Sequence, residues 1–329
     1  MIFHQNHIGN MNSYPHQKDQ LPKGISIVVP VYNSYDSLTL LSKRLKSIFE
    51  QIGGCFELIM VNDGSEDDSW DIIVQLSRSY EWCRGFNLIR NYGQHNAVLC
   101  GVRMAKYDTI VTMDDDLQHP PEEIPKLIEE LANGYDCVYG KPIKYQHSFL
   151  RNLATFITKL ALQKAMGTLP ATNIGPFRAF RTSLRNAFSN YRGSYVSIDA
   201  LLTWGTRKFS VVEVNHATRT TNHSNYTWKK LILHTINMMT GFSTLPLKLA
   251  SLIGFSSAVL GVCLFVYVLL KFMIVGGQVP GFSFLASTLL IFSGAQLVAI
   301  GIMGEYLARI FSRTLDQPVY LVSETTDEI

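Results

Sequence analysis

Three consecutive aspartates, Asp114, Asp115 and Asp116, follow an apolar stretch in the segment TIVTMDDDLQHPPEEI. Adjacent like charges repel, and burying unpaired carboxylates is costly. A divalent cation, Mg²⁺ or Mn²⁺, would remove this penalty, because hard cations prefer carboxylate oxygens and can bridge to a diphosphate. In an extended strand Asp114 and Asp116 point to one side and Asp115 to the other, so the first and third are the predicted metal ligands. The alternative is an acidic turn or helix cap ahead of Pro121.

The sequence on both sides of the aspartates alternates between strand and helix patterns. Apolar, β-branched runs predict strands at 24–33, 56–65, 85–91, 108–116 and 135–141, and apolar residues at helical spacing predict helices at 36–51, 70–80, 94–105 and from 121 onward. This alternation is typical of an α/β fold with a mostly parallel sheet covered by helices on both faces. In such sheets, ligands bind at the carboxyl ends of the strands.

Polar motifs stand at three of these predicted strand ends: Tyr32-Asn33, the turn 62–65 and the segment 114–118. Asp63, in the second motif, could accept hydrogen bonds from a base or a ribose, or could cap the helix that follows Ser65. The three motifs together favour a nucleotide and metal site at one edge of the sheet.

The totals exclude some classes of protein. The chain has 329 residues and a net charge of +3, too mild for nucleic acid as the main partner. Its five cysteines are scattered without paired spacing, which indicates reduced, packed thiols rather than a disulfide framework or a zinc site. Residues 1–23 are polar, lack the apolar core of a signal peptide, and are expected to form a flexible tail.

Two long uncharged runs distinguish the C-terminal third, and we predict transmembrane helices at about 249–271 and 282–304 within 246–311. At about 1.5 Å per residue, each run can cross a hydrocarbon core of about 30 Å. Basic residues flank the pair: Lys229, Lys230 and Lys248 before it, Arg309 and Arg313 after it. The positive-inside rule therefore predicts that both flanks, both termini and the domain at 24–226 lie in the cytoplasm, with 312–329 as a cytoplasmic tail.

Two further segments have an apolar stripe and basic residues, at about 147–166 and at 227–245. Helices of this kind can lie in the headgroup layer of a membrane. We expect an interfacial helix at the first and a juxtamembrane amphipathic helix at the second. Packing against the soluble core is the alternative for both.

The motifs VVPVYN, VNDGS, IRNYGQHNAV and MDDDLQHPPEEI, together with the terminal apolar pair, resemble family 2 glycosyltransferases of GT-A (Rossmann-like) fold. More narrowly, residues 24–320 resemble the polyprenyl-phosphate glycosyltransferases, a group that includes dolichol-phosphate mannose synthase, bactoprenol glucosyltransferase and the undecaprenyl-phosphate aminoarabinose transferase. The resemblance implies metal-dependent, inverting transfer of a sugar from a nucleotide diphosphate donor, UDP by analogy with bacterial members, to undecaprenyl phosphate. It also implies a multi-pass protein of the bacterial inner membrane that serves cell-envelope glycan or lipopolysaccharide modification, and a possible homo-oligomer such as a tetramer.

The resemblance also implies roles for individual residues. The residues implied to contact the nucleotide are Pro30, Tyr32, Asn33, Asp63 and Asp114. The implied metal ligands are Asp114, Asp116 and Gln118, and these ligands are catalytic together with Arg219, which would contact the donor phosphates. The residues implied to bind the acceptor phosphate are Arg151, Thr155, Arg178, Ser224 and Tyr226. The chain departs from the family pattern where Ser34 replaces an acidic residue, where Asp115 replaces a small one, and where Asn222 replaces a glycine. An acidic residue expected upstream of Arg178 is also absent.

A phosphate acceptor makes a catalytic base unnecessary, because a phosphate monoester with a second pKa near 6 is already a nucleophile at neutral pH. We therefore expect His95 and His119 to be polar loop residues rather than bases. A processive polysaccharide synthase is disfavoured, since the chain has no QxxRW motif and few spans. The alternatives from other classes are a membrane-anchored nucleotide-sugar-binding regulator without catalysis and, less favoured with two spans, a transporter.

Overall fold

The computed structural model describes residues 23–143, 175–193, 196–217, 245–275 and 281–328. The predicted N-terminal tail, the interfacial helix at 147–166 and the juxtamembrane helix at 227–245 fall almost entirely outside these residues. Five predicted site residues also lie outside them: Arg151, Thr155, Arg219, Ser224 and Tyr226.

One mixed sheet forms the centre of the N-terminal domain, with strand order β7-β5-β6-β4-β1-β2-β3-β8. The strands are β1 (Ile25–Val31), β2 (Phe56–Asn62), β3 (Cys83–Leu88), β4 (Thr109–Thr112), β5 (Cys137–Pro142), β6 (Arg178–Arg181), β7 (Phe209–Val214) and β8 (Val322–Thr325). β4, β1, β2 and β3 run parallel, as the alternation of strands and helices predicts, whereas β6 and β8 are antiparallel to their neighbours. The parallel strands place their carboxyl ends, and the motifs that follow them, at one edge.

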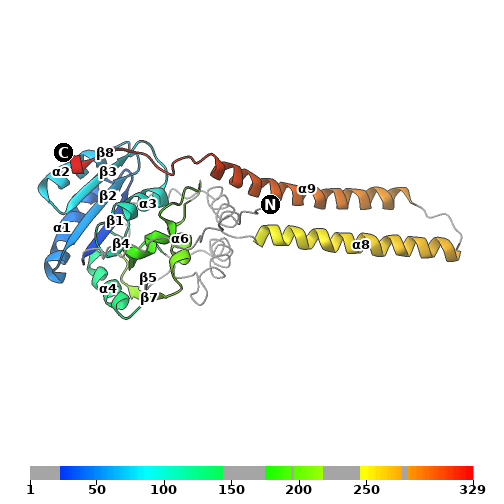
Figure 1. The fold of residues 1–329 in the computed structure, drawn as a ribbon, viewed down its shortest axis with the longest axis horizontal. Helices are drawn as coiled ribbons and strands as arrows, with labels where there is room; N and C mark the ends of the chain where they lie inside the picture. The colour runs from blue at the N-terminus through cyan, green and yellow to red at the C-terminus, as the bar shows by residue number, and fades with distance from the viewer. Residues whose placement is uncertain (1–22, 144–174, 194–195, 218–244, 276–280, 329) are drawn as a thin grey trace, which may run out of the picture.

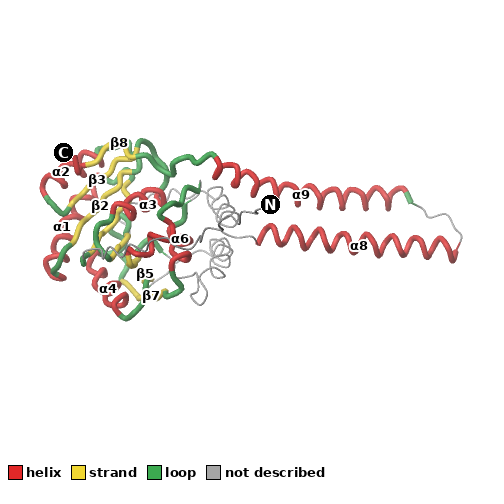
Figure 2. Tube along the Cα trace, in the orientation of Figure 1, coloured by secondary structure: helices red, strands yellow, loops and turns green. Residues whose placement is uncertain are grey.

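Helices cover both faces of this sheet (Figures 1 and 2). One face carries α1 (Tyr35–Ile52), α2 (Ser69–Ser79), the short 3₁₀ helix η1 (Pro121–Glu123) and α4 (Ile124–Ala132). The other carries α3 (Gln94–Met104), the 3₁₀ helix η3 (Thr182–Phe188) and α6 (Ile198–Gly205). The second layer lies on the side of the domain from which the two long C-terminal helices project (Figure 1).

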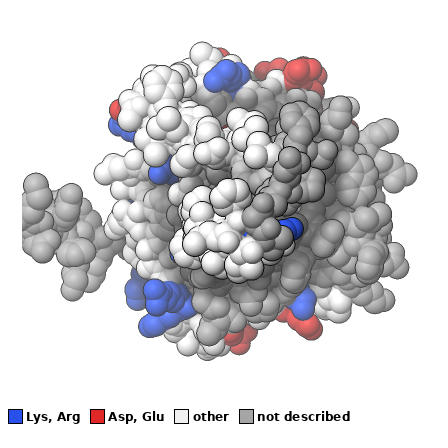
Figure 3. All heavy atoms as spheres, turned by 90° about the vertical axis from the view of Figure 1, so that its right-hand side faces the viewer, with Lys and Arg blue, Asp and Glu red and all other residues white. Residues whose placement is uncertain are grey.

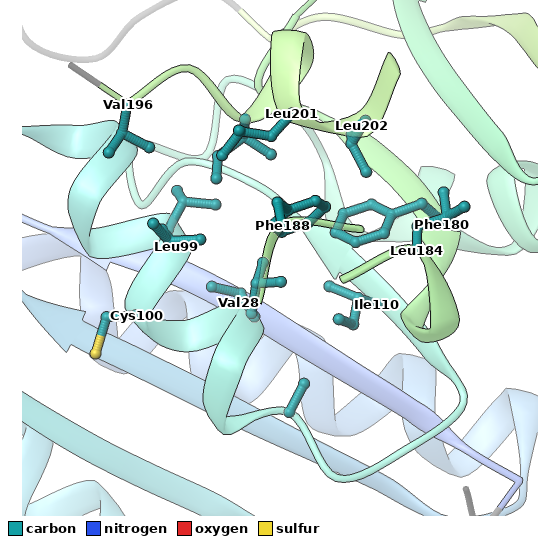
Figure 4. Packing of buried hydrophobic residues seen from close by; sticks show 14 of the residues in the cluster. Val28, Leu99, Cys100, Ile110, Phe180, Leu184, Phe188, Val196, Leu201 and Leu202 are labelled. Atoms are coloured by element: carbon teal, nitrogen blue, oxygen red, sulfur yellow. The ribbon is translucent and has the colours of Figure 1, made fainter. Parts of the chain in front are cut away.

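The strands are apolar on both sides because both faces are buried. Along β1, Ile27 packs under α1 while its neighbour Val28 packs under α3, and each is fully buried. Figure 4 shows Val28 and Ile110 of the sheet among side chains of α3, η3 and α6. Gly101 allows α3 to approach closely, since a Cβ there would lie 2.4 Å from a methyl carbon of Val28.

Two long helices, α8 (Leu245–Val275) and α9 (Phe282–Thr314), run side by side away from the domain (Figure 1). Their apolar stretches, Pro246–Ile274 and Ile291–Thr314, have mean hydropathies of 2.4 and 1.4, and both are long enough to cross a membrane. Neither stretch is buried within the protein, so their apolar side chains require a non-aqueous environment. The two predicted spans are confirmed as apolar helices, and the second continues ten residues further than expected, to Thr314.

The segment after α9 differs from the tail that we expected at 312–329. Residues Val322–Thr325 form β8, which pairs antiparallel with β3 at the edge of the sheet. Ile89 donates its backbone N–H to the carbonyl of Leu321 at 3.0 Å, and Gly85 donates to the hydroxyl of Thr326 at 2.8 Å. The segment is short and polar and shows no apolar alternation, so its strand conformation comes from the edge that it completes rather than from its own pattern.

The cysteines agree with the expectation of reduced, mostly packed thiols. All five are free, and Cys83, Cys100 and Cys137 are buried in the domain core. Burial raises the pKa of the Cys83 and Cys100 thiols to about 12, which leaves them protonated and unreactive at neutral pH.

Candidate active site

The aspartates lie in a loop beyond β4. The strand ends at Thr112, and a turn begins at Asp115, so the strand alternation that we used to pair Asp114 with Asp116 does not apply. The backbone continues one step along β1, since Met113 donates its N–H to the carbonyl of Val28 at 3.2 Å, and then turns away. The turn is closed by the N–H of Gln118, which donates to the Asp116 carboxylate at 3.1 Å. A loop can direct successive carboxylates independently, whereas a strand cannot.

Asp114 is held by the start of α3. The side-chain amide of Gln94, the first residue of this helix, donates to Oδ1 of Asp114 at 2.6 Å. Asp114, Asp115 and Asp116 are each half-buried, at the edge of the sheet where β1 and β2 also end. The nearby positive end of the α3 dipole favours negative charge at this position.

Asp115, to which sequence reasoning assigned no role, contacts the loop after β1. Burial raises the pKa of its carboxyl to about 6; hydrogen bonds from the Ser34 hydroxyl and the Tyr32 backbone N–H oppose this shift, and the charge of Asp116 adds to it. Ser34 and Asp115 are both positions at which the chain departs from the family pattern, and the structure brings these two departures together. The loop after β1 and the loop after β4 are therefore joined through this pair.

The loops after β1 and β2 are also joined by hydrogen bonds. Asn33 adopts a left-handed conformation with φ of 51°, donates its N–H to the Ser65 hydroxyl at 3.0 Å, and accepts from the N–H of Glu66 at 2.8 Å. Tyr32 beside it is 44% exposed, so its ring is available to a ligand. Pro30 is buried within β1, opposite Val61 of β2. The nucleotide contacts of these residues stay predictions.

Asp63 is 3% exposed and accepts two backbone hydrogen bonds, from Tyr92 at 2.7 Å and from Gly93 at 2.8 Å. It therefore fixes the loop that leads into α3. Burial raises the pKa of its carboxyl to about 6, although the two N–H groups act in the opposite direction. The alternative that Asp63 caps the helix after Ser65 is wrong, because that helix begins at Ser69 with Asp68 at its N-cap.

Arg178 lies on β6 with 2% of its surface exposed. Its guanidinium forms an ion pair with Asp199 of α6 and donates from Nε to the hydroxyl of Thr112 at 2.9 Å. The Tyr139 hydroxyl also donates to Asp199, at 3.1 Å. Arg178 thus fixes the end of β4, the strand that leads into the aspartate loop. Its predicted contact with an acceptor phosphate stays a prediction.

His119 is a loop residue, as we expected, but its side chain is buried. It is 7% exposed, stacks on Phe177 with ring centroids 5.2 Å apart, and meets His216 edge-on at 5.1 Å. Burial, assisted by His216, lowers its pKa to about 4, so the ring is neutral at pH 7. The expectation that His95 is a loop residue is wrong, because it is a half-buried residue in the first turn of α3.

The segment after β7 reaches the aspartate loop. Ala217 donates its N–H to the carbonyl of Gln118 at 2.9 Å, next to His216. Sequence reasoning did not single out His216. Its position follows from the path of β7 at the far side of the sheet, which no local pattern in the sequence reveals.

The side chains of the aspartate loop suit a hard divalent cation that takes part of its coordination shell from the substrate. Across the described ranges, no three side chains of His, Cys, Asp and Glu converge into a closed cage. The loop instead offers the carboxylates of Asp114 and Asp116 and the amide of Gln118. Mg²⁺ commonly binds through one or two carboxylates and completes its shell with substrate phosphates and water. The residues therefore fit a cation that is bound together with a diphosphate.

Comparison with known proteins agrees with this geometry. Residues 26–188 match the family "Glycosyl transferase family 2". The chain is 35% identical to the undecaprenyl-phosphate 4-deoxy-4-formamido-L-arabinose transferase of Photorhabdus laumondii over 309 residues, covering 93% of this chain and 95% of that protein. It is also 35% identical to the enzyme of the same name from Pectobacterium carotovorum, covering 92% and 94%.

Among solved structures, the Mycobacterium tuberculosis glucosyl-3-phosphoglycerate synthase in complex with Mn²⁺, UDP-glucose and phosphoglyceric acid aligns with a TM-score of 0.50 at 17% identity, covering 66% of this chain and 78% of that one. This likeness shows the fold, which is GT-A as the sequence predicts. The chain belongs to glycosyltransferase family 2 and is a glycosyltransferase.

Proposed function

We propose that this enzyme transfers a sugar from a UDP-sugar to undecaprenyl phosphate in the bacterial inner membrane and yields an undecaprenyl monophosphate sugar. The observation that carries this proposal is the 35% identity to undecaprenyl-phosphate sugar transferases over 93% of the chain. The match extends well beyond the family domain at 26–188 and so includes the long apolar helices that would place the enzyme beside a lipid acceptor.

The proposed reaction is a single displacement. An oxygen of the acceptor phosphate attacks the anomeric carbon, and the bond from that carbon to the β-phosphate oxygen of the nucleotide breaks, which inverts the anomeric configuration. The acceptor is largely dianionic at pH 7 and needs no base. His119 fits this scheme, because its low pKa and buried, stacked ring suit a structural role.

The leaving diphosphate carries the charge that the enzyme must neutralise. In the proposal Asp114, Asp116 and Gln118 hold Mg²⁺ or Mn²⁺, which supplies that neutralisation when bound. Gln94 orients Asp114 through the hydrogen bond described above. Arg219 would add a positive charge toward the donor phosphates; it follows Ala217, which is bonded to Gln118, by two residues.

The remaining contacts follow the same proposal. Pro30, Tyr32, Asn33 and Asp63 would line the nucleotide, at the ends of β1 and β2. The acceptor phosphate would be bound by Arg151, Thr155, Ser224 and Tyr226, with Arg178 of β6, which lies opposite Thr112 at the end of β4.

The proposed topology places both termini and the catalytic domain in the cytoplasm. It is supported by β8, because the chain before α8 and the chain after α9 belong to one sheet, and a two-helix hairpin returns its ends to the same side of a membrane. A reporter enzyme inserted between α8 and α9 should be active only outside the cytoplasm. Activity on the cytoplasmic side would contradict the topology.

Transfer can be tested with the full-length protein, undecaprenyl phosphate and a panel of radiolabelled UDP-sugars, by measuring label in a chloroform-extractable product. We expect product that EDTA abolishes and Mn²⁺ or Mg²⁺ restores. Asp116→Asn should lower the rate by roughly 100-fold or more, as for loss of a group that stabilises the transition state. Asp71→Asn, on the exposed first turn of α2, is the matched control. Undiminished transfer in EDTA or by Asp116→Asn would refute the metal site, and absence of lipid-linked product with every donor would refute the reaction.

A further inference from the structure

A cavity that is not lined by the aspartates lies where α9 meets the catalytic domain. It has a volume of about 390 Å³ and is lined by the loop after η3, by Trp204 at the end of α6, and by Arg313 in the last turn of α9. Asn190 and Arg192 of the loop also line it. Residues of the catalytic domain and of α9 therefore line the same cavity.

The loop that forms this cavity is firmly held. The carbonyl of Tyr191 accepts from the Arg103 guanidinium of α3 at 2.7 Å, and its N–H donates to the carbonyl of Phe188 at 3.0 Å. The Tyr191 ring is 8% exposed and packs edge-on against Trp204, with centroids 5.6 Å apart. The cavity is thus preformed, which lowers the entropic cost of binding a ligand.

Its chemistry suits a phosphate at a membrane surface. Arg192 and Arg313 come from separate segments, and guanidinium groups bind phosphate oxygens in a two-point geometry. Trp204 is 52% exposed, and exposed tryptophan is enriched where protein meets lipid headgroups. Arg192 also pairs with Asp316, but both side chains of that pair are 61% exposed, so the pair contributes little and can open.

The position of the cavity along α9 also agrees with a site at the membrane surface. The apolar stretch of α9 ends at Thr314, one residue after Arg313. The layer of α3, η3 and α6 lies on the side from which α8 and α9 project (Figure 1), and Figure 3 shows Lys and Arg as well as Asp and Glu groups at the margin of that face. A headgroup of the leaflet that α9 enters would therefore lie at the level of Arg313 and the cavity.

None of the described residues that line the cavity is among the predicted metal, nucleotide or acceptor residues. β6 pairs antiparallel with β4, with Arg181 opposite Thr109, so η3 begins at the edge of the sheet opposite to the one that carries the aspartates. The side chain and backbone N–H of Thr182 confirm this position by bonding the carbonyls of Tyr107 and Asp108.

We infer that this cavity binds the phosphate of an anionic glycerophospholipid of the cytoplasmic leaflet, held by Arg192 and Arg313 against Trp204. The bound lipid would fix the catalytic domain to the membrane beside α9. This inference rests on the insertion of α9 in a membrane and does not depend on the sugar that is transferred.

Binding can be measured on the full-length protein in mild detergent by native mass spectrometry and by the shift in Tm. Phosphatidylglycerol should bind and raise Tm, and phosphatidylcholine should do so at least several-fold less well. The Arg192→Gln/Arg313→Gln variant should lose roughly 30-fold in apparent affinity for phosphatidylglycerol, from the usual contribution of two basic residues at a lipid surface. Arg78→Gln, an exposed arginine in the last turn of α2, removes the same kind of charge from the other layer and should bind like wild type.

Asn190→Asp provides a second variant of nearly equal size, in an exposed loop position, that should weaken binding by placing a negative charge in the cavity. Both cavity variants should keep their transfer rate in detergent. Equal phosphatidylglycerol affinity in the cavity variants and in Arg78→Gln would overturn the inference, as would equal binding of the two lipids. Displacement of phosphatidylglycerol by millimolar inorganic phosphate with the same rise in Tm would assign the cavity to a soluble anion. Loss of undecaprenyl phosphate binding in the variants would assign it to the acceptor. Either result would also overturn the inference.

Discussion

Arg84 on β3 and Asp327 near the end of the chain form a two-point ion pair, with Nε–Oδ1 at 2.8 Å and a second bond from Nη2 to Oδ2 at 2.5 Å. The remaining nitrogen of the guanidinium donates to the buried carboxylate of Glu57 at 2.9 Å. Because Asp327 follows α9, this pair and β8 hold the C-terminal end of the helical hairpin to the sheet. The segment after α9 is therefore attached to the catalytic domain by strand pairing as well as by the covalent link.

Removing the charge of Asp327 should loosen this attachment. We expect Asp327→Asn to lower the free energy of unfolding by about 1 kcal/mol, because the pair is charge-assisted but the Asp327 side chain is 37% exposed and screened by solvent. Arg84 lowers the pKa of Asp327, so the stabilisation is present at neutral pH and is lost only as the pH falls below its ordinary value of 3.8. Thermal unfolding at pH 7, with the exposed Glu81→Gln as control, measures the effect. A Tm equal to that of the control would show that β8 is held by the backbone ladder alone.

Gln94 should act through the aspartate that it orients. Because its amide donates to Asp114 at 2.6 Å, Gln94→Ala should leave that carboxylate free to rotate and should raise the concentration of Mn²⁺ or Mg²⁺ needed for half-maximal transfer by roughly tenfold, the lower end for outer-shell partners. Saturating metal should restore most of the rate. Gln75→Ala, on the exposed face of α2, is the control. If the metal concentration for half-maximal transfer is unchanged, with or without a lower maximal rate, Gln94 does not act through metal binding.

Much of the fold is predictable because the strands and helices carry local signals. The buried runs before Asn33, Asp63 and Asp114 gave the parallel centre of the sheet, and the helices expected at 36–51, 70–80 and 94–105 end within about one residue of those observed. These signals are strong because each parallel strand is apolar on both faces, so period and composition agree.

The features that the sequence did not reveal depend on contacts with residues far away in the chain. β8 is polar and forms only because the edge of β3 is available, and the end of β4 at Thr112 is set by pairing with β1 and β6 rather than by the acidic run itself. The contact between Ser34 and Asp115 joins two loops whose sequences read separately as departures from the family pattern. Comparison of many related chains for paired changes at these two positions is the signal that could have found it.

Asp63 should make stability depend on pH. Its carboxyl has a pKa of about 6 in the folded protein against an ordinary value of 3.8, because burial penalises its charge. Between these values the folded chain holds a proton that the unfolded chain has lost, so this group favours folding at low pH, and its contribution falls as pH rises toward 6. Asn does not titrate, so the Tm of wild type relative to Asp63→Asn should be higher at pH 5 than at pH 8, with a difference in unfolding free energy of about 1.4 kcal/mol, because pH 5 lies about one unit below the folded pKa. A difference between the two proteins that is independent of pH would contradict the raised pKa.

Arg178 can be tested for two roles at once. Arg178→Met leaves Asp199 charged and buried without its partner, and should lower the free energy of unfolding by about 3–5 kcal/mol. Asp199→Asn in the same chain removes the uncompensated charge, so the double variant should recover a large part of the lost Tm.

Transfer activity then separates structure from chemistry. If Arg178 also contacts the acceptor phosphate, as proposed, the double variant should regain its Tm but not its rate, and its KM for undecaprenyl phosphate should stay raised, because methionine cannot bind an anion. Thr112→Val is the matched control, since it removes the other hydrogen bond of the guanidinium and keeps its charge. If the double variant recovers its rate together with its Tm, the role of Arg178 is only to hold the end of β4, which precedes the aspartates.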